Sequence, residues 1–257
     1  MIRHSLPTLG QEEAEAVSTV IASGNIAQGR EVEAFEQEVA EFVGKKHGVA
    51  VSSGTAALHL SLIALSQGRS QHVAMPAYAC AALVTATGLA NHQSTLVDIT
   101  DQFNIDIKKM PENADITVVP HLFGAKSDLP DTTAVIEDIA QSIGGTTGAE
   151  SPIAVASFYA TKVMTTGEGG MVLTNDSSIA EQIRDLRDYD NRDELVQRFT
   201  YKLTDLQAAM GRVQLKRLPS FVERRRAIAA RYTEAFRSIE SLKLPDPTDH
   251  IFSATLC

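Results

Sequence analysis

A series of short apolar runs constrains the fold of this chain more than any other feature. The runs are HGVAVSS, HVAMP, STLVDI, DITVVP, TAVIED, IAVASF and MVLTN, each bounded by turn residues. Helix-like stretches such as TAALHLSLIAL and CAALVTATGLA separate several of them. Strands that are almost wholly apolar are typical of a mostly parallel sheet flanked by helices on both faces. The pattern therefore predicts an α/β fold.

Amphipathic helices are expected on both sides of this region. EVEAFEQEVAEFVG has helical apolar spacing, and Gly44 is a suitable stop. From Ser177 onward the pattern is helical, and TDLQAAMGRVQLKRL begins with a capping-box pair, Thr204 and Gln207. SFVERRRAIAARYTEAF continues this helical pattern. The residues expected to form the buried stripe of the helix after Thr204 are Leu206, Met210 and Val213.

Composition excludes several classes of function. The chain has 257 residues, of which 44% are hydrophobic, enough for a sizeable core. A formal charge of −9 disfavours a nucleic-acid partner. No apolar run reaches transmembrane length, and we expect neither a signal peptide nor a membrane partner. Two cysteines, Cys80 and Cys257, give no disulfide framework, which favours a cytoplasmic location.

Polar residues follow the apolar runs, where ligands of open α/β sheets bind. SSGTAAL joins a strand end to a helix start through Gly54. Unpaired N–H groups at such a helix start, beside the hydroxyls of Ser53 and Thr55, suit a phosphate group. An ordinary helix N-cap is the alternative.

Other polar residues near strand ends have ordinary explanations when taken singly. Asp138 could pair with a cationic ligand atom beside Gln141, or cap a turn. Taken alone, Lys162 is most simply a surface lysine and Ser157 a hydroxyl at a strand end. Glu168 is most simply part of a constrained glycine turn. Together they change the interpretation. A phosphate cradle, an acid for a pyridine nitrogen and a lysine after a serine are what pyridoxal phosphate (PLP) requires.

The order of motifs then resembles the DegT/DnrJ/EryC1/StrS family. The motifs are SGTAAL, PAYACAA, VPHLFGAKSDL, VIEDIAQSIGG, SFYATKVMTTGEGGMVLTND and YKLTDLQAAMGRVQLKRL, and the resemblance covers essentially the whole chain. It implies the PLP-dependent transferase fold of type I and a homodimer with active sites at the subunit interface. It also implies a domain division into an N-terminal segment (1–25), a PLP-binding large domain (26–217), and a long helix with the start of a truncated small domain (218–257).

The resemblance implies an aminotransferase. Such enzymes move an amino group from an amino acid, typically glutamate or glutamine, to a keto-sugar that is mostly nucleotide-linked. Lys162 would bond covalently to PLP and then carry protons, Asp138 would pair with the pyridine nitrogen, and Gln141 would lie near the 3-hydroxyl. The residues implied to hold the phosphate are Gly54, Thr55 and Ser157. Related sugar dehydratases have a histidine in place of the lysine, so Lys162 favours transamination in amino-sugar or polysaccharide biosynthesis. No metal is implied.

The chain departs from the family pattern at several places. Thr200 stands where the family usually has an asparagine that reaches the neighbouring subunit's phosphate. Cys80 stands where many members have an aromatic that stacks on the cofactor, and Tyr78 lies two residues earlier. DHIFSATLC is expected to be the first strand of the small domain. The alternative function is a non-catalytic remnant that binds PLP or dimerises without turnover. A nucleotide-binding domain is disfavoured because there is no glycine fingerprint.

Overall fold

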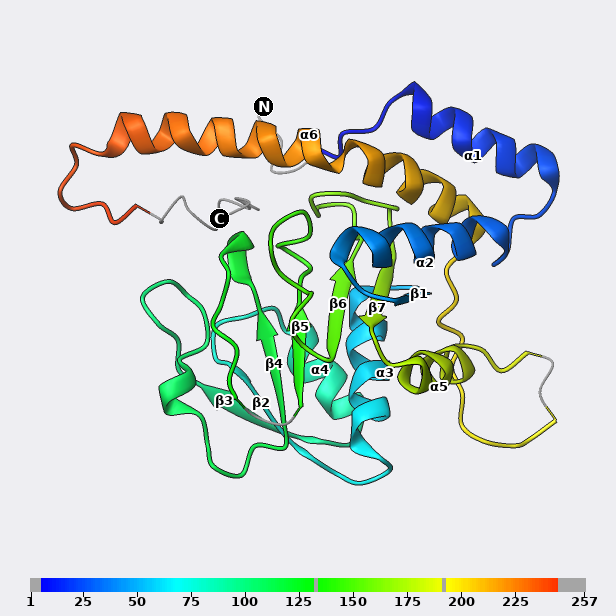
Figure 1. Cartoon of the computed structure of the whole chain (residues 1–257), viewed down its shortest axis with the longest axis horizontal. Helices are drawn as coiled ribbons and strands as arrows, with labels where there is room; N and C mark the ends of the chain where they lie inside the picture. The colour runs from blue at the N-terminus through cyan, green and yellow to red at the C-terminus, as the bar shows by residue number, and fades with distance from the viewer. Residues whose placement is uncertain (1–5, 132–133, 191–192, 245–257) are drawn as a thin grey trace.

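A mostly parallel sheet forms the centre of the computed structural model, which describes residues 6–131, 134–190 and 193–244 (Figure 1). The seven strands within these residues are β1 (His47–Val51), β2 (His72–Pro76), β3 (Gln93–Val97), β4 (Ile116–Pro120), β5 (Val135–Asp138), β6 (Ile153–Ser157) and β7 (Gly170–Thr174). Their order across the sheet is β1-β7-β6-β5-β4-β2-β3. Strand β7 is antiparallel to both β1 and β6, and the other neighbouring strands are parallel. The predicted α/β class is confirmed.

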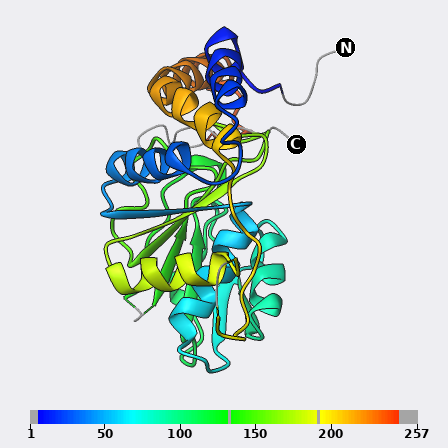
Figure 2. The ribbon, with the colours of Figure 1, turned by 90° about the vertical axis from the view of Figure 1, so that its right-hand side faces the viewer.

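Helices cover both faces of the sheet (Figure 2). The α-helices are α1 (Gln11–Ser23), α2 (Arg30–Val43), α3 (Gly54–Ser66), α4 (Ala82–Leu89), α5 (Ser177–Arg187) and α6 (Asp205–Phe236). Short 3₁₀ turns are η1 (Ile107–Lys109) and η2 (Leu122–Gly124). Helices α3, α4 and α5 lie on one face, whereas α2 and the first part of α6 cover the other and α1 packs on α6.

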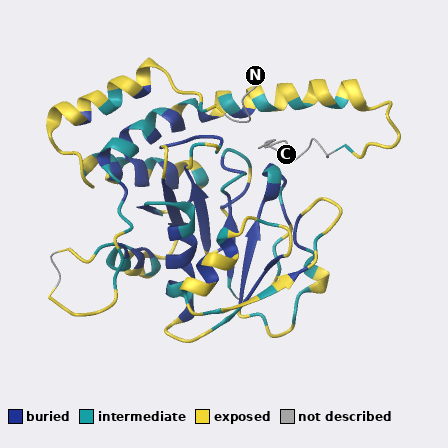
Figure 3. Cartoon of the chain, turned by 180° about the vertical axis from the view of Figure 1, so that it is seen from behind, coloured by how far each residue is buried: buried dark blue, intermediate teal, exposed yellow. Residues whose placement is uncertain are grey.

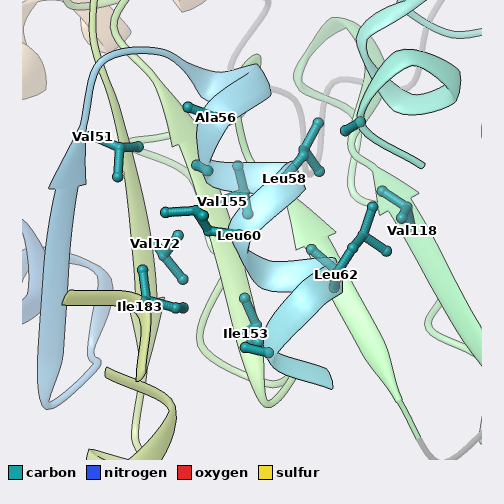
Figure 4. Close-up of a cluster of buried hydrophobic side chains, with 14 of the residues drawn as sticks. Val51, Ala56, Leu58, Leu60, Leu62, Val118, Ile153, Val155, Val172 and Ile183 are labelled. Atoms are coloured by element: carbon teal, nitrogen blue, oxygen red, sulfur yellow. The ribbon is translucent and has the colours of Figure 1, made fainter. Parts of the chain in front are cut away.

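Alternate residues of each central strand supply two separate cores. In β6, Ile153 and Val155 pack with α3, whereas Ala154 and Ala156 pack with α2 and α6. Figure 4 shows the α3 side of this arrangement. Because side chains of a strand alternate between faces, a strand covered on both sides must be apolar throughout. This explains the continuous apolar runs of the sequence.

Helix α6 begins as the sequence predicts and differs in the face that it buries. Thr204 and Gln207 form the capping box. Its buried side chains include Ala208, Ala209, Leu215 and Leu218, however, whereas the expected stripe of Leu206, Met210 and Val213 is only half-buried.

Close packing explains this difference in α6. A Cβ atom on Gly211 would lie 2.7 Å from the Phe35 ring, so the small-residue face is the one that can approach α2. The outer part of α6 is largely exposed (Figure 3). The predicted domain boundary between residues 217 and 218 falls inside this helix. The strand expected in DHIFSATLC lies outside the described residues.

Candidate active site

A cavity of about 350 Å³ opens at the carboxyl ends of the central strands. Every residue that the sequence singled out for cofactor contact lines it: Gly54, Thr55, Asp138, Gln141, Ser157 and Lys162. Asp138 and Ser157 end β5 and β6, Gly54 and Thr55 begin α3, and Gln141 and Lys162 lie in the segments that follow β5 and β6. The sheet therefore brings together side chains that are more than a hundred residues apart in the chain.

The phosphate cradle predicted from SSGT lies where α3 begins. Ser53 caps the helix, since its Oγ accepts a hydrogen bond from the Ala56 N–H at 3.0 Å. The first N–H groups of a helix have no carbonyl partner within it, which leaves those of Gly54 and Thr55 for a ligand. Ser53 is thus an ordinary N-cap, and the next two residues line the cavity, where a phosphate site stays a prediction.

Glycine at position 54 is required by the approach of α3 to the end of β6. A Cβ atom on Gly54 would lie 2.8 Å from the Ser157 Cβ. The strand order explains this proximity, since Gly170 of β7 pairs with both Val51 of β1 and Ser157 of β6. Ser157 therefore faces the same small space as the start of α3, where its hydroxyl could contact the same ligand.

Asp138 is the last residue of β5 and is buried at the base of the cavity. One carboxylate oxygen, Oδ1, accepts the Ala140 N–H at 2.9 Å. Burial raises the pKa of Asp138, and the Ala140 bond and the charge of Lys162 offset this only in part. A buried acid of this kind is stabilised in its charged form by a cationic partner.

Lys162 lies half-buried in the loop between β6 and β7 and lines the cavity. Its N–H donates to the Tyr159 carbonyl at 2.9 Å, which forms a turn. The loop is closed on itself, since the Thr166 N–H donates to the Phe158 carbonyl at 3.0 Å. Gln214 of α6 accepts the Thr165 N–H at 3.3 Å. The amine of Lys162 is therefore carried by a braced turn.

Gln141 faces the cavity from the segment after β5. Its Oε1 accepts the Phe123 N–H at 2.8 Å, and since an N–H can only donate, the amide orientation is fixed. The group that Gln141 can offer to a ligand is therefore its NH₂ donor. An NH₂ donor suits an oxygen acceptor such as the 3-hydroxyl of a pyridine ring.

His121 is a buried residue that lines the cavity, and the sequence analysis gave it no role. Its Nδ1 accepts the Ser127 N–H at 3.0 Å, so the neutral ring donates from Nε2 to Glu137 Oε1, also at 3.0 Å. Burial alone raises the pKa of Glu137, but hydrogen bonds from His121, Ser151 and Gly148 lower it to about 2. His121 follows the apolar run DITVVP directly, so the strand-end rule could have found it.

Comparison with known proteins decides the family. The model of the DegT/DnrJ/EryC1/StrS aminotransferase family matches residues 7–256. The chain belongs to this family. The spore coat polysaccharide biosynthesis protein SpsC of Bacillus subtilis (strain 168) is 35% identical over 94% of this chain and 71% of its own length.

Solved structures of similar fold include two with cofactor chemistry in their descriptions. DesV of S. venezuelae, in complex with a ketimine intermediate, has 29% identity and a TM-score of 0.85, over 94% of this chain and 72% of DesV. NtdA of Bacillus subtilis, with bound cofactor PMP, has 24% identity and a TM-score of 0.85, over 98% of this chain and 66% of NtdA. The predicted fold of type I, the aminotransferase class and the cofactor PLP are confirmed for this family member.

The cavity of this family member fits PLP. A helix start with free N–H donors suits the phosphate, a buried acid with a raised pKa suits the ring nitrogen, and the Gln141 NH₂ suits the ring oxygen. Lys162 supplies the amine. Among the described residues, no cluster of three or more potential metal ligands occurs and no helix is long and apolar enough to span a membrane.

The departures from the family pattern have distinct outcomes. Cys80 lines the cavity, whereas Tyr78 instead packs against Phe103 and Phe123. Thr200 is exposed and does not line the cavity of its own chain. The backbone carbonyl of the next residue, Tyr201, accepts the Ser52 N–H at 2.7 Å, which holds this segment beside the start of α3. Tyr159 and Glu168 also line the cavity, although the sequence reading gave neither a role.

Proposed function

We propose that this chain transfers an amino group from glutamate or glutamine to the carbonyl carbon of a nucleotide-linked keto-sugar. The observation that carries the proposal is the convergence of Lys162, Asp138 and the cradle around Gly54 on one cavity. The similarity to SpsC supports a role in amino-sugar or polysaccharide biosynthesis. The similarity to DesV supports PLP-dependent transamination.

Each residue has a defined task in this proposal. PLP, when bound, supplies an aldehyde that bonds to amines and a pyridinium ring that withdraws electrons. Gly54 and Thr55 hold its phosphate through their N–H groups, together with the Ser157 hydroxyl. Asp138 Oδ2, the carboxylate oxygen not bonded to the Ala140 N–H, keeps a proton on the ring nitrogen. Gln141 orients the ring through its NH₂ group.

Lys162 is the proposed catalytic residue. Lys162 Nζ would hold PLP at its aldehyde group, and the same side chain would act as the general base and acid that moves a proton at the substrate carbon. The same amine acts in the reverse sense when the keto-sugar is the substrate. The hydrogen bonds around Lys162 hold the turn that carries this amine beside the cavity.

Two further features belong to the proposal. We expect a homodimer in which Thr200, exposed in the single chain, contacts the partner subunit. Light scattering during size-exclusion chromatography measures the mass directly, and a monomer at micromolar concentration would contradict this part. A cytoplasmic location also stays a prediction, supported by the absence of a disulfide framework in the sequence.

The absorbance spectrum of the purified protein with added PLP tests the proposal. We expect a band near the edge of the visible range in the wild type and none in Lys162→Ala. Glutamate or glutamine should then convert the wild-type spectrum to that of the aminated cofactor. A folded wild type without the band would overturn the proposal. A band that no amino donor converts would instead support the non-catalytic remnant.

A further inference from the structure

The turn that carries Lys162 is anchored mainly on its C-terminal side. Tyr159 and Thr161, which precede the lysine, are exposed. Val163 and Met164, which directly follow it, are buried in the core that α2 and α6 share. The position of the Lys162 backbone therefore depends more on contacts with α6 than on the exposed residues that lead to it.

Two glutamines of α6 hold this loop by hydrogen bonds. Gln207 Nε2 donates to the Glu168 carbonyl at 2.9 Å. Gln214 Oε1 accepts the Thr165 N–H at 3.3 Å. Residues seven apart in a helix are about two turns apart and lie on one face. One face of α6 therefore holds the loop at two points after the lysine.

Thr165 is the point at which the loop is tied together. Its hydroxyl donates to the Phe158 carbonyl at 3.0 Å and accepts the Gly167 N–H at 2.8 Å. Thr165 is buried, and its own N–H is the one bonded to Gln214. A change at this N–H is therefore passed to both ends of the loop that carries Lys162.

The side-chain amide of Gln214 has a single possible orientation. Its Nε2 donates to the Thr8 carbonyl at 3.0 Å and to Glu13 Oε1 at 2.7 Å. A carbonyl and a carboxylate only accept, whereas the Thr165 N–H only donates, so an inverted amide would lose all three bonds. Gln214 is also almost fully buried, which leaves it no alternative partners in water.

Glu13 of α1 fixes the amide from the other side. Its Oε1 also accepts from Arg217 Nη1 at 2.6 Å, and its Oε2 accepts the Gly10 N–H at 2.8 Å. Burial raises the pKa of Glu13, but hydrogen bonds from Gln214, Gly10 and Arg217 lower it below its ordinary value of 4.5. The carboxylate is therefore charged at neutral pH and holds the Gln214 NH₂ group.

We propose that Gln214 is a positioning residue for Lys162, an inference that rests on the proposed function. Gln214 does not line the cavity, and it acts through Thr165 by holding the lysine loop against α6. Without this acceptor the buried Thr165 N–H would have to move to find another partner. A shift of about 1 Å in a catalytic group can lower a rate by about 100-fold.

Two substitutions of Gln214 separate positioning from stability. Gln214→Met has a similar size and removes the acceptor, so the rate at which glutamate converts the cofactor spectrum should fall about 10- to 100-fold. The KM for glutamate should stay the same, because Gln214 does not line the cavity. Gln214→Glu keeps an oxygen for the Thr165 N–H but faces Glu13 with a second carboxylate. Its Tm should fall while its rate stays close to that of the wild type.

Arg217 offers a matched control. It donates to Glu13 and lies over the Phe221 ring, and both contacts are outside the Lys162 loop. Arg217→Met should therefore lower the Tm and leave the conversion rate unchanged. Rates that follow the Tm across all three variants would give Gln214 a structural role alone and overturn the inference.

Hydrogen exchange of the cofactor-free protein reads the same contact without turnover. Deuterium uptake is measured by mass spectrometry on peptides that cover residues 158–168. The Thr165 N–H should exchange about tenfold faster in Gln214→Met, the equivalent of one lost hydrogen bond, and at the wild-type rate in Arg217→Met. Unchanged exchange in Gln214→Met would overturn the inference.

The cofactor spectrum separates this inference from the proposed function. A wild type without the band would overturn the proposed function and the positioning role together. A normal band in Gln214→Met, converted by glutamate at the wild-type rate, would overturn the positioning role alone and leave the aminotransferase standing.

Discussion

At the scale of single residues, two adjacent carboxyl groups have pKa values shifted in opposite directions. Glu137 and Asp138 are neighbours in β5, so their side chains point to opposite faces of the sheet. Glu137 accepts N–H groups from His121, Gly148 and Ser151, whereas only one N–H donor to Asp138, that of Ala140, is seen in the described part of the chain. Hydrogen bonds thus lower the pKa of Glu137, and burial raises that of Asp138. The hydrogen bonds of Glu137 tie it into the fold, whereas Asp138 has the free carboxylate oxygen that the proposed function assigns to the ring nitrogen of PLP.

Asp138→Asn should stabilise the protein when it lacks the cofactor. The folded-state pKa of Asp138 is raised above its ordinary value of 3.8, so the folded state binds more protons than the unfolded state. Its carboxyl therefore costs stability as the pH rises above 3.8. We expect the Tm of the cofactor-free variant to exceed that of the wild type at pH 7, with no difference below pH 3.8. Thermal unfolding between pH 3 and pH 8 measures this, and a lower Tm at pH 7 would contradict it.

The same Asp138→Asn variant should lose activity, because asparagine cannot hold the ring nitrogen protonated. We expect the rate of glutamate-driven conversion to fall about 100-fold or more, the usual size of a lost acid–base group. Stopped-flow absorbance on the PLP-loaded variant measures this rate. Wild-type conversion by this variant would remove Asp138 from the proposed mechanism.

Glu137→Gln should destabilise the protein at neutral pH and flatten its acid response. The NH₂ group of the introduced glutamine would have to face a backbone or histidine N–H donor, which lowers the free energy of unfolding by about 1–3 kcal/mol. The depressed pKa of Glu137 gives stability that is present above its ordinary value of 4.5 and is lost as the pH falls to about 2. Urea unfolding at pH 6 and pH 3 should therefore show a large difference between the two proteins at pH 6 and a small one at pH 3. Equal stability at pH 6 would show that the network contributes nothing.

At the scale of elements, the start of α3 is fixed by its contact with β6. Gly54→Ala places a Cβ atom 2.8 Å from the Ser157 Cβ, and neither atom can rotate away. The cradle must open, so we expect PLP affinity to fall about tenfold or more, the equivalent of one charge-assisted hydrogen bond. Fluorescence titration with PLP measures this. Gly88→Ala in α4 is the control, since its added Cβ meets nothing within 4 Å and should stabilise the helix. Equal PLP affinity in the two variants would contradict the cradle.

The sequence predicted the elements better than their contacts. The apolar runs identified the strands and the Thr204 capping box identified the start of α6, because both signals are local. The prediction of which face of α6 is buried was wrong, because that face is set by the close contact between Gly211 and the Phe35 ring. The insertion of β7 between β1 and β6 joins distant parts of the chain, so no local pattern shows it.

The candidate site was predicted in part for the same reason. Asp138 and Ser157 end their strands and Lys162 follows one, where the strand-end rule and the family resemblance agree. The bond between Phe123 and Gln141 depends on a strained turn that the sequence does not reveal. The position of His121 in the cavity was not predicted, because a histidine directly after an apolar strand can equally be an ordinary buried core residue.

At the scale of the whole molecule, the sheet brings the proposed cofactor-binding residues together at the carboxyl ends of its strands. The start of α3, Ser157 and Asp138 line one cavity, and the β6–β7 loop carries Lys162 into the same cavity. In the proposed function, the phosphate and the ring nitrogen of PLP therefore have separate partners around one amine. Lys162, among all the lysines of the chain, is therefore the one proposed to bond to the cofactor.

Mass spectrometry after borohydride reduction tests this claim most directly. The PLP-loaded protein is reduced, digested and mapped, which makes the bond between cofactor and lysine permanent. We predict the phosphopyridoxyl mass on the peptide that contains Lys162, in a ratio of about one per chain. Label on another lysine, with Lys162 unmodified in folded protein, would contradict the account.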